Sequence, residues 1–210
     1  LLELMKRTNC GRVFVGFESI DQDVLDEYHK NQNLEDIKKC ISTYHDYGIS
    51  VHGMFMFGAE NDTKESFHRT IGFAEEHGLD TAQFLLLTPV PGTQLFKKMD
   101  EEGRIFTYDW SLYDGHHVVF EPANMSPLEL QIESLKANRR FYSARSAFRS
   151  LSKLKFGTAM LRYLGKQGVQ KWHQKNTDFL HRLRSWQKGK INFPRQFSIQ
   201  QAQPSGLNLQ

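Results

Sequence analysis

The sequence predicts an α/β fold of parallel strands joined by helices, followed by a mainly helical C-terminal region. In the first hundred residues, short apolar segments alternate with segments whose apolar residues recur every three or four positions. Two helix-to-strand joints have the same form, Tyr47-Gly48-Ile49 and His77-Gly78-Leu79. Such alternation implies right-handed crossovers between parallel strands, and three strands make an incomplete barrel or sheet.

The first strand–helix unit begins at residue 12. Residues 12–17 are short and apolar, as in a strand that is buried on both faces. Leu34, Ile37 and Ile41 then mark one face of a helix. Gly48 stands where the C-terminal cap of that helix is expected.

Two further strands complete the pattern. Residues 49–57 form the second strand, and Asp62-Thr63-Lys64-Glu65 has the spacing of a capping box. Its helix ends at Gly78, and residues 81–87 form the third strand. The first strand would have a bare apolar edge, so we expect upstream strands. The opening Leu1-Leu2, without an initiator Met, leads us to expect a longer protein.

The second part of the chain is predicted to be mainly helical. After a short helix over 94–102, residues 117–120 are strand-like. Ser126-Pro127-Leu128-Glu129 is a further capping box, and its helix is expected to run to about Ser146. Apolar residues between 169 and 186 predict another amphipathic helix. We divide the chain into a barrel part (1–103), a connector (104–123), a basic helical region (124–190) and a disordered polar tail (191–210).

The net charge of +3 hides two parts of opposite sign. Residues 1–123 hold 11 Lys/Arg against 21 Asp/Glu, and residues 124–210 hold 16 against 3. The basic part could face a membrane or nucleic acid, or its helices could dock on the acidic barrel part. Charge complementarity favours docking, and nucleic acid is not the expected partner. The basic stretch is Arg139, Arg140, Arg145, Arg149, Lys153 and Lys155, interleaved with Phe141, Tyr142, Phe148 and Phe156.

Composition excludes several classes of protein. No apolar run approaches the ~20 residues that span a bilayer, and no leader with a cleavage site is present, so a cytoplasmic location is expected. Cys10 and Cys40 lack a CxxC spacing. Two thiols alone form neither a disulfide framework nor a zinc or iron–sulfur site, and we expect both to pack as small hydrophobic residues.

Each predicted strand ends in residues that suit a ligand. In parallel α/β folds, ligands bind at the carboxyl ends of the strands. One such segment alone is an ordinary turn, since Gly, Pro and Ser are common there, but three at equivalent positions indicate a shared binding edge. The segments are Gly16-Phe17-Glu18-Ser19, Met56-Phe57-Gly58-Ala59-Glu60 and Thr88-Pro89-Val90-Pro91-Gly92-Thr93.

These segments resemble the radical S-adenosylmethionine (SAM) superfamily. The strings VFVGFES, GMFMFGAENDT and FLLLTPVPGTQL resemble the fourth, fifth and sixth strands of its (β/α) barrel. The continuation DWSLYDGHHVVFEP, with MSPLEL and RRFYS, resembles the branch that carries a cobalamin-binding domain and includes hopanoid-methylase-like proteins. The likeness covers roughly residues 8–145. It implies a partial TIM-like barrel, the last three βα units of a radical SAM barrel, before the helical region.

The resemblance implies a SAM site at the shared edge. Glu18 would accept hydrogen bonds from the ribose hydroxyls or the SAM ammonium group, and Ser19 would orient it. Gly58 would let the backbone approach the ligand closely. The loop that would read the adenine edge through its main chain contains Thr88, Pro89, Pro91, Gly92 and Thr93.

The resemblance also implies a 4Fe–4S cluster and possible use of cobalamin in the full-length protein. The family's C-x3-C-x2-C cluster motif and a cobalamin module are absent from this sequence. We therefore expect the SAM-binding half of a methyltransferase-like enzyme, inactive alone, without catalytic or metal-ligating residues of its own. Its partners would be the missing N-terminal half and a lipid-like substrate, with peripheral membrane contact.

Other residues have weaker signals. Trp110 and Tyr113 resemble the segment that follows the family's barrel and would contact substrate or pack beneath its cavity. His116-His117 is expected to be structural, since strand neighbours point to opposite faces. Two alternatives stay open: a truncated barrel that binds membrane or nucleic acid through its basic helices, and a non-radical barrel enzyme with Glu18 and Glu60 as an acid–base pair.

Overall fold

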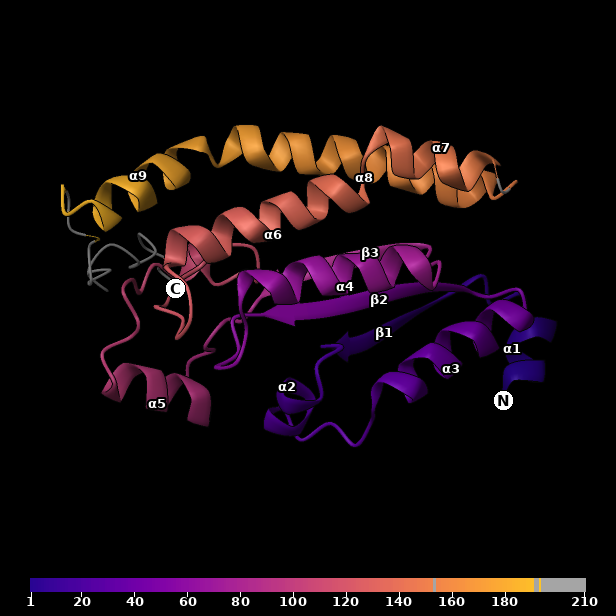
Figure 1. The fold of residues 1–210 in the computed structure, drawn as a ribbon, viewed down its shortest axis with the longest axis horizontal. Coiled ribbons are helices and arrows are strands. Elements are labelled where there is room, and N and C mark those ends of the chain that lie inside the picture. The colour runs from indigo at the N-terminus through magenta and orange to yellow at the C-terminus, as the bar shows by residue number, and fades with distance from the viewer. Residues whose placement is uncertain (153, 191–192, 194–210) are drawn as a thin grey trace, which may run out of the picture.

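A three-stranded parallel sheet forms the centre of the computed structural model, which describes residues 1–152, 154–190 and 193 (Figure 1). The strands pair in the order β1-β2-β3, so all three carboxyl ends lie at one edge. The predicted α/β class is confirmed, and each strand matches its expected range to within one residue. The strands are β1 (Arg12–Glu18), β2 (Ser50–Phe57) and β3 (Thr81–Leu86).

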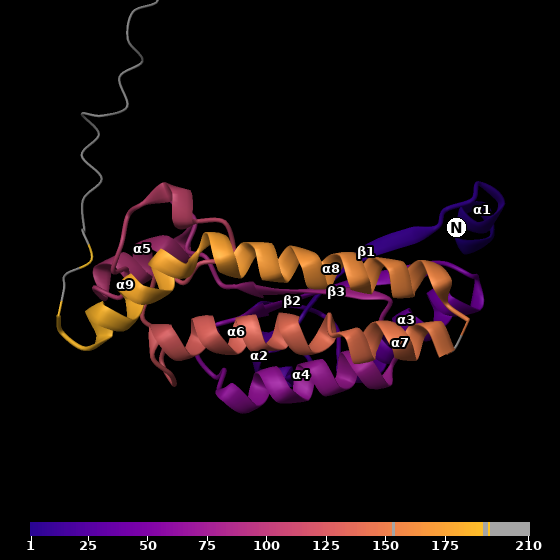
Figure 2. The same cartoon turned by 90° about the horizontal axis from the view of Figure 1, so that it is seen from above.

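Two crossover helices, α3 (Leu34–Asp46) and α4 (Lys64–Glu76), lie on one side of the sheet (Figure 2). Asn33 caps α3 by accepting a hydrogen bond from the Asp36 main-chain N–H at 3.0 Å. After the helices, the predicted cap positions Gly48 and Gly78 have φ of +74° and +69°. Glycine takes this left-handed conformation without a steric penalty, so both helices end where the sequence predicts.

The start of α4 differs from the prediction. Thr63 rather than Asp62 is the N-cap, and Ser66 Oγ accepts a hydrogen bond from the Thr63 N–H at 3.2 Å. Asp62 instead accepts hydrogen bonds from the main-chain N–H groups of Gly58 and Ala59. The sequence offers two capping residues in a row, and the fold of the preceding loop decides between them.

The helix-covered face of the sheet holds the apolar core. Phe57 of β2 stacks on Phe67 of α4 with 3.9 Å between ring centroids. Phe84 of β3 meets Phe141 edge-on at 5.6 Å. All four side chains are buried, and burial of aromatic rings at about 25 cal/mol per Å² is the main force that joins sheet to helices.

The two edges of the sheet differ. On the outer side of β3, Ser134 Oγ donates to the Phe84 carbonyl at 3.2 Å, and the Leu86 N–H donates to the Gly115 carbonyl at 2.7 Å. Helix and connector thus satisfy this edge without another strand. Among the described strands, β1 pairs with β2 alone, and Phe14 of β1 is 66% exposed.

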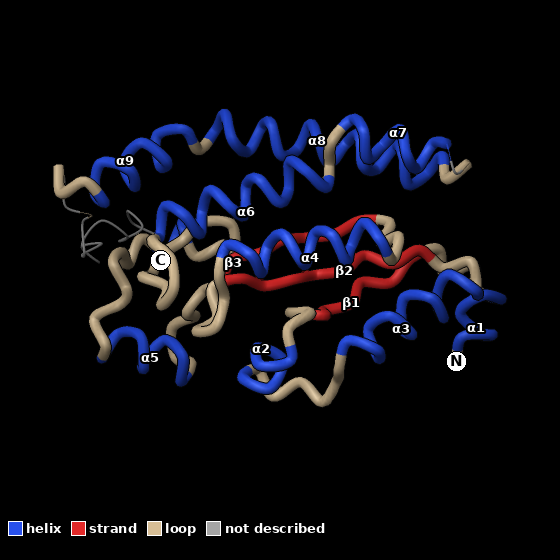
Figure 3. Tube along the Cα trace, viewed as in Figure 1, coloured by secondary structure: helices blue, strands red, loops and turns tan. Residues whose placement is uncertain are grey.

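Beyond residue 126 the described chain is mainly helical, as predicted (Figure 3). The first helix ends at Phe141 instead of near Ser146, and a second one begins at Ala144. The helix predicted between 169 and 186 is two helices that meet at Asn176. The C-terminal helices are α6 (Pro127–Phe141), α7 (Ala144–Ser152), α8 (Phe156–Lys175) and α9 (Thr177–Gln187), and α5 (Gln94–Glu101) precedes them after β3.

Smaller elements were harder to predict. The short helices α1 (Leu2–Arg7) and α2 (Gln22–Glu27) are too brief for an apolar period to show. The strand-like segment at 117–120 forms only an isolated antiparallel bridge to Ile105. The predicted disordered tail lies outside the described residues, apart from a buried Phe193. No described helix has the length and apolar character that crossing a membrane requires.

Candidate functional site

The end of β1 has the most distorted backbone at the shared edge. Gly16 pairs with Met54 and Glu18 with Phe55, so Phe17 is the extra residue of a bulge. Glu18 has φ of +64°, a left-handed conformation that costs about 1–3 kcal/mol for a residue other than glycine. Bulges and strained residues of this kind cluster at functional sites because they re-aim a side chain.

The Glu18 carboxylate folds back over β1. A side chain at Gly16 would place its Cβ 2.5 Å from Glu18 Oε1, so the glycine makes room for the carboxylate. Glu18 Oε1 lies 3.2 Å from Lys30 Nζ, and the Glu18 side chain is 22% exposed. The next residue, Ser19, is buried, and its Oγ accepts a hydrogen bond from the Asp21 N–H at 3.0 Å. Ser19 therefore holds the turn that follows Glu18.

The end of β2 is held by Asp62. Gly58 has φ of +111°, and its main-chain N–H and that of Ala59 donate to Asp62 Oδ2 at 2.8 and 3.0 Å. A Cβ at Gly58 would lie 2.9 Å from the Phe120 ring and 3.3 Å from Leu130. Close packing of the connector and α6 thus explains the glycine without a ligand. Its predicted contact with SAM stays a prediction.

The loop after β3 is mostly exposed. Pro89 is buried, whereas Pro91, Gly92 and Thr93 are exposed. Thr93 Oγ1 donates to the Val90 carbonyl at 2.7 Å and accepts from the Phe96 N–H at 3.1 Å, which fixes the loop to the start of α5. Thr88, at the start of the loop, donates its hydroxyl to the Leu86 carbonyl at 3.1 Å. The loop is held by its own hydrogen bonds, and residues 90–93 are exposed to solvent.

The two substrate candidates lie beside this loop. Trp110 is 49% exposed, and its ring contacts Tyr113 at 4.9 Å and Phe96 of α5 at 6.3 Å between centroids. Tyr113 donates its hydroxyl to the Thr107 carbonyl at 2.8 Å, and burial raises its pKa. Tyr113 therefore supports the connector, while Trp110 is available for contact with another molecule.

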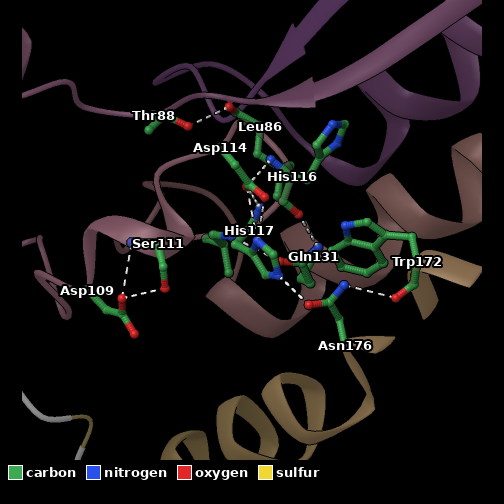
Figure 4. A network of polar contacts seen from close by, with 11 residues as sticks. Leu86, Thr88, Asp109, Ser111, Asp114, His116, His117, Gln131, Trp172 and Asn176 are labelled. Carbon is green, nitrogen blue, oxygen red and sulfur yellow. Dashed lines mark hydrogen bonds and ion pairs between the residues drawn. The ribbon is translucent and has the colours of Figure 1, made fainter. Parts of the chain in front are cut away.

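A polar network joins the connector to the C-terminal helices (Figure 4). His117 Nδ1 lies 3.0 Å from both carboxylate oxygens of Asp114, and Nε2 lies 2.9 Å from Asn176 Oδ1. Burial raises the Asp114 pKa, but hydrogen bonds from His117 and from the His116 N–H outweigh it, and the pKa is lowered. Gln131 Nε2 donates to the His116 carbonyl at 2.9 Å. These contacts give His117 a structural role.

The metal-ligating and acid–base alternatives find no support in the side-chain contacts. Cys10 and Cys40 are free thiols, and within the described ranges no three His, Cys, Asp or Glu side chains gather as a metal site. Iron–sulfur clusters are held by several Cys thiolates, so the residues of this chain do not fit one. Glu60 Oε1 lies 2.5 Å from Arg104 Nη1, and Glu18 is paired with Lys30, so each carboxylate has its own cation.

The sequence pattern predicts the binding edge, but the residues that support this edge lack a clear pattern. Lys30 and Arg104 pair with carboxylates 12 and 44 positions away, and Asp62 anchors the loop by accepting from N–H groups three and four positions before it. Asp62 does have a local signal, a carboxylate four residues after a strand-end glycine, but the same residue also fits the capping-box pattern. Lys30 and Arg104 had no local signal.

Comparisons with known proteins agree with the sequence patterns. Residues 1–74 match a family model described as the Radical SAM superfamily. A bacteriochlorophyllide d C-12(1)-methyltransferase of Chlorobaculum tepidum is 34% identical over 141 residues, covering 67% of this chain and 30% of the relative. A hopanoid C-2 methylase of Rhodopseudomonas palustris is 31% identical over 106 residues, covering 50% of this chain and 20% of the relative.

Among solved structures, an N-terminally truncated Elp3 of Methanocaldococcus infernus superposes with a TM-score of 0.47 and 20% identity. The superposed region covers 63% of this chain and 28% of the Elp3 chain. The chain thus spans less than a third of the length of each of these three proteins.

Proposed function

We propose that this chain, which belongs to the radical SAM superfamily, forms the SAM-binding part of a methyltransferase-like radical SAM enzyme. It contributes three βα units and the helical region that follows. Since it spans 30% or less of its curated relatives, we assign the other barrel strands to a further N-terminal part, which is its partner.

The shared edge carries this proposal. Three adjacent parallel strands end there, which is where ligands of α/β folds bind. Glu18 presents a partly exposed carboxylate that can accept hydrogen bonds from the ribose hydroxyls or ammonium group of SAM. Residues 88–93 present main-chain donors and acceptors for the adenine edge. The residues of this edge therefore fit SAM.

The remaining cofactors are assigned outside this chain. In this superfamily, SAM and a 4Fe–4S cluster together supply a 5′-deoxyadenosyl radical. The two cysteines present do not fit a cluster, so we place its ligands, and any cobalamin site, in the N-terminal part. The chain alone then releases no 5′-deoxyadenosine from SAM under reducing conditions.

For the substrate we propose an apolar, lipid-like or tetrapyrrole molecule that receives a methyl group at an unactivated carbon. The named relatives act on a bacteriochlorophyllide and on hopanoids. Trp110 would contact this substrate, because its ring is half exposed beside the binding edge. We place the enzyme in the cytoplasm with peripheral contact with a membrane.

Titration of the chain with SAM, followed by calorimetry, tests the binding edge. We expect saturable binding, and we expect Glu18→Gln to weaken it by about tenfold. The substitution removes one charge-assisted hydrogen bond of about 1.5–3 kcal/mol, and the new amide partly offsets this loss. The matched control is Glu76→Gln, an exposed carboxylate at the far end of α4.

Two results would contradict the proposal. If binding does not saturate at about 1 mM SAM, the binding free energy is weaker than about −4 kcal/mol. That result would favour the alternative of a truncated barrel without redox chemistry. If Glu18→Gln and Glu76→Gln bind SAM with equal affinity, Glu18 does not contact SAM.

A further inference from the structure

The outermost helices expose a cluster of apolar side chains. Within residues 148–164, seven large apolar residues have exposed fractions between 43% and 75%. Elsewhere in the described ranges five such residues are scattered singly or in pairs over α1, β1 and the loops. Figures 1 and 2 show α7 and α8 joined at one end of the molecule, far from α5. We call the cluster the α7–α8 apolar face: Phe148, Leu151, Leu154, Phe156, Met160, Tyr163 and Leu164.

These two helices bury polar side chains and expose apolar ones. Their buried residues are Ser146 and Ser150 on α7 and Thr158 and Arg162 on α8. The apolar residues of α8 recur at intervals of four, three and one, which is one helical face, and that face points to solvent. Soluble helices normally bury the apolar face and expose the polar one, so a second surface is needed to cover this one.

The charge around the face is of one sign. Residues 134–177 contain eleven Lys or Arg and no Asp or Glu. Arg145 and Arg149 are exposed, flank Phe148 on α7, and take part in none of the ion pairs among the described residues. Lys155, between Leu154 and Phe156, is instead paired with the Asp80 carboxylate, with its Nζ 3.6 Å from Asp80 Oδ1.

We propose that the α7–α8 apolar face docks on an anionic lipid bilayer. The apolar side chains enter the boundary between headgroups and acyl chains, and Arg145 and Arg149 bind lipid phosphates. The helices lie in the membrane plane and do not cross it, in agreement with the lack of a spanning helix among the described residues. Docking rests on the proposed peripheral location and needs neither SAM nor a cluster.

Chemistry favours lipid over the other occupants. Leu151, Leu154 and Met160 are aliphatic, and they gain free energy in hydrocarbon but cannot stack on nucleic-acid bases. A second copy of the chain would bring the same uncompensated cations against each other, which opposes a dimer through this face.

Vesicle co-sedimentation of the whole chain tests the proposal. We expect binding to phosphatidylcholine vesicles that contain about 30% phosphatidylglycerol, and weak binding without it, because each basic residue near an anionic surface adds attraction. Arg145→Gln with Arg149→Gln should weaken partitioning about 30-fold, as two cations are lost. Phe148→Ser with Phe156→Ser should weaken it at least tenfold at constant charge.

Two control variants carry the same kinds of substitution at positions outside the α7–α8 apolar face. Lys97→Gln with Lys98→Gln removes two exposed cations from α5, and Leu1→Ser with Leu4→Ser removes two exposed apolar side chains at the start of the chain. Both controls should bind vesicles as the wild-type chain does. SAM titration of each variant should be unchanged, which separates failure of docking from failure of the SAM assignment.

Three outcomes would overturn the proposal. Vesicle binding that is insensitive to Phe148→Ser with Phe156→Ser excludes insertion of the apolar face. Salt-sensitive retention on DNA that exceeds vesicle binding assigns the cations to nucleic acid. A concentration-dependent dimer that Phe148→Ser abolishes, seen by sedimentation velocity, assigns the face to a second copy.

Discussion

Asp62 combines burial and charge at the end of β2. Its side chain is 2% exposed, and Oδ2 accepts two main-chain hydrogen bonds from the loop. Burial raises its pKa to about 6, although hydrogen bonds from Gly58, Ala59 and Ser66 favour the ionised form. The carboxylate is therefore kept ionised at neutral pH at a cost in stability, and it holds the loop that follows β2.

The raised pKa of Asp62 predicts that the free energy of unfolding depends on pH. The native pKa lies above the ordinary value of 3.8, so between these values the native state binds more protons than the unfolded state. The free energy of unfolding should fall by about 1 kcal/mol between pH 5 and pH 7, and Asp62→Asn should lack this component. Urea unfolding of both proteins at the two pH values measures it. Parallel pH profiles would show that Asp62 does not titrate there.

Glu18 illustrates a residue whose position follows from its strand but whose orientation does not. The strand pattern placed it at the binding edge. The bulge at Phe17, the left-handed φ and the pairing with Lys30 come from three-dimensional contacts. These features decide where the carboxylate points, and hence what it can bind.

The break between α6 and α7 shows how one side chain ends a helix. Tyr142 donates its hydroxyl to the Ala82 carbonyl at 2.6 Å and accepts from the Ala82 N–H at 3.0 Å. Ala82 lies on the outer edge of β3, where no described strand pairs with it. Reaching this edge takes Tyr142 out of helical geometry, and in return two buried main-chain groups are satisfied.

Removal of that hydroxyl should be costly. Tyr142→Phe leaves a buried N–H and a buried carbonyl without their partner, so the free energy of unfolding should fall by about 2–3 kcal/mol. Tyr163→Phe, which removes a half-exposed hydroxyl from α8, should change it by less than about 0.5 kcal/mol. Urea midpoints of both variants provide the comparison. Equal midpoints would mean that water replaces the Tyr142 hydroxyl.

At the scale of the whole molecule, Arg162 of α8 joins the C-terminal helices to the sheet. Its guanidinium donates to the carbonyls of Leu79 and Asp80 at 2.5 and 3.1 Å and to Ser146 Oγ at 2.6 Å. The Asp80 carboxylate is bound by His45 of α3 and Thr158 of α8. Burial raises the Asp80 pKa, but these hydrogen bonds outweigh it and hold the pKa far below its ordinary value.

We expect Arg162→Met to destabilise the protein by about 3 kcal/mol. The change leaves the buried main-chain carbonyls of Leu79 and Asp80 without the donor that Arg162 provides. Arg139→Met, an exposed arginine of α6, is the control and should have a small effect. Thermal unfolding monitored by circular dichroism distinguishes them. A wild-type melting temperature for Arg162→Met would mean that packing alone holds α8 on the sheet.

The opposite charges of the two parts are only partly matched in the structure. Arg140 pairs with Glu75 at 3.1 Å, and Lys155 lies 3.6 Å from Asp80, so basic helices do contact the acidic part. Arg145 and Arg149 of α7 are exposed to solvent. Docking therefore accounts for part of the basic stretch, and the rest is available to an anionic surface.

The sequence by itself determined the strands, the crossover helices and the edge at which the three strands end. These depend on local period and on glycines at caps, and both are visible in short windows. Its family strings were enough to identify the radical SAM superfamily. It also predicted the capping box at Ser126, which the structure contains.

Only the tertiary structure decided where α6 ends, which of Asp62 and Thr63 caps α4, and which aromatic residues are buried. Phe141 and Tyr142 are buried, whereas Phe148 and Phe156 of the same basic stretch are exposed. The physical reason is that each outcome depends on partners tens of positions away, such as Ala82 for Tyr142 and Leu79 for Arg162. Local propensity cannot encode a partner that only folding brings near.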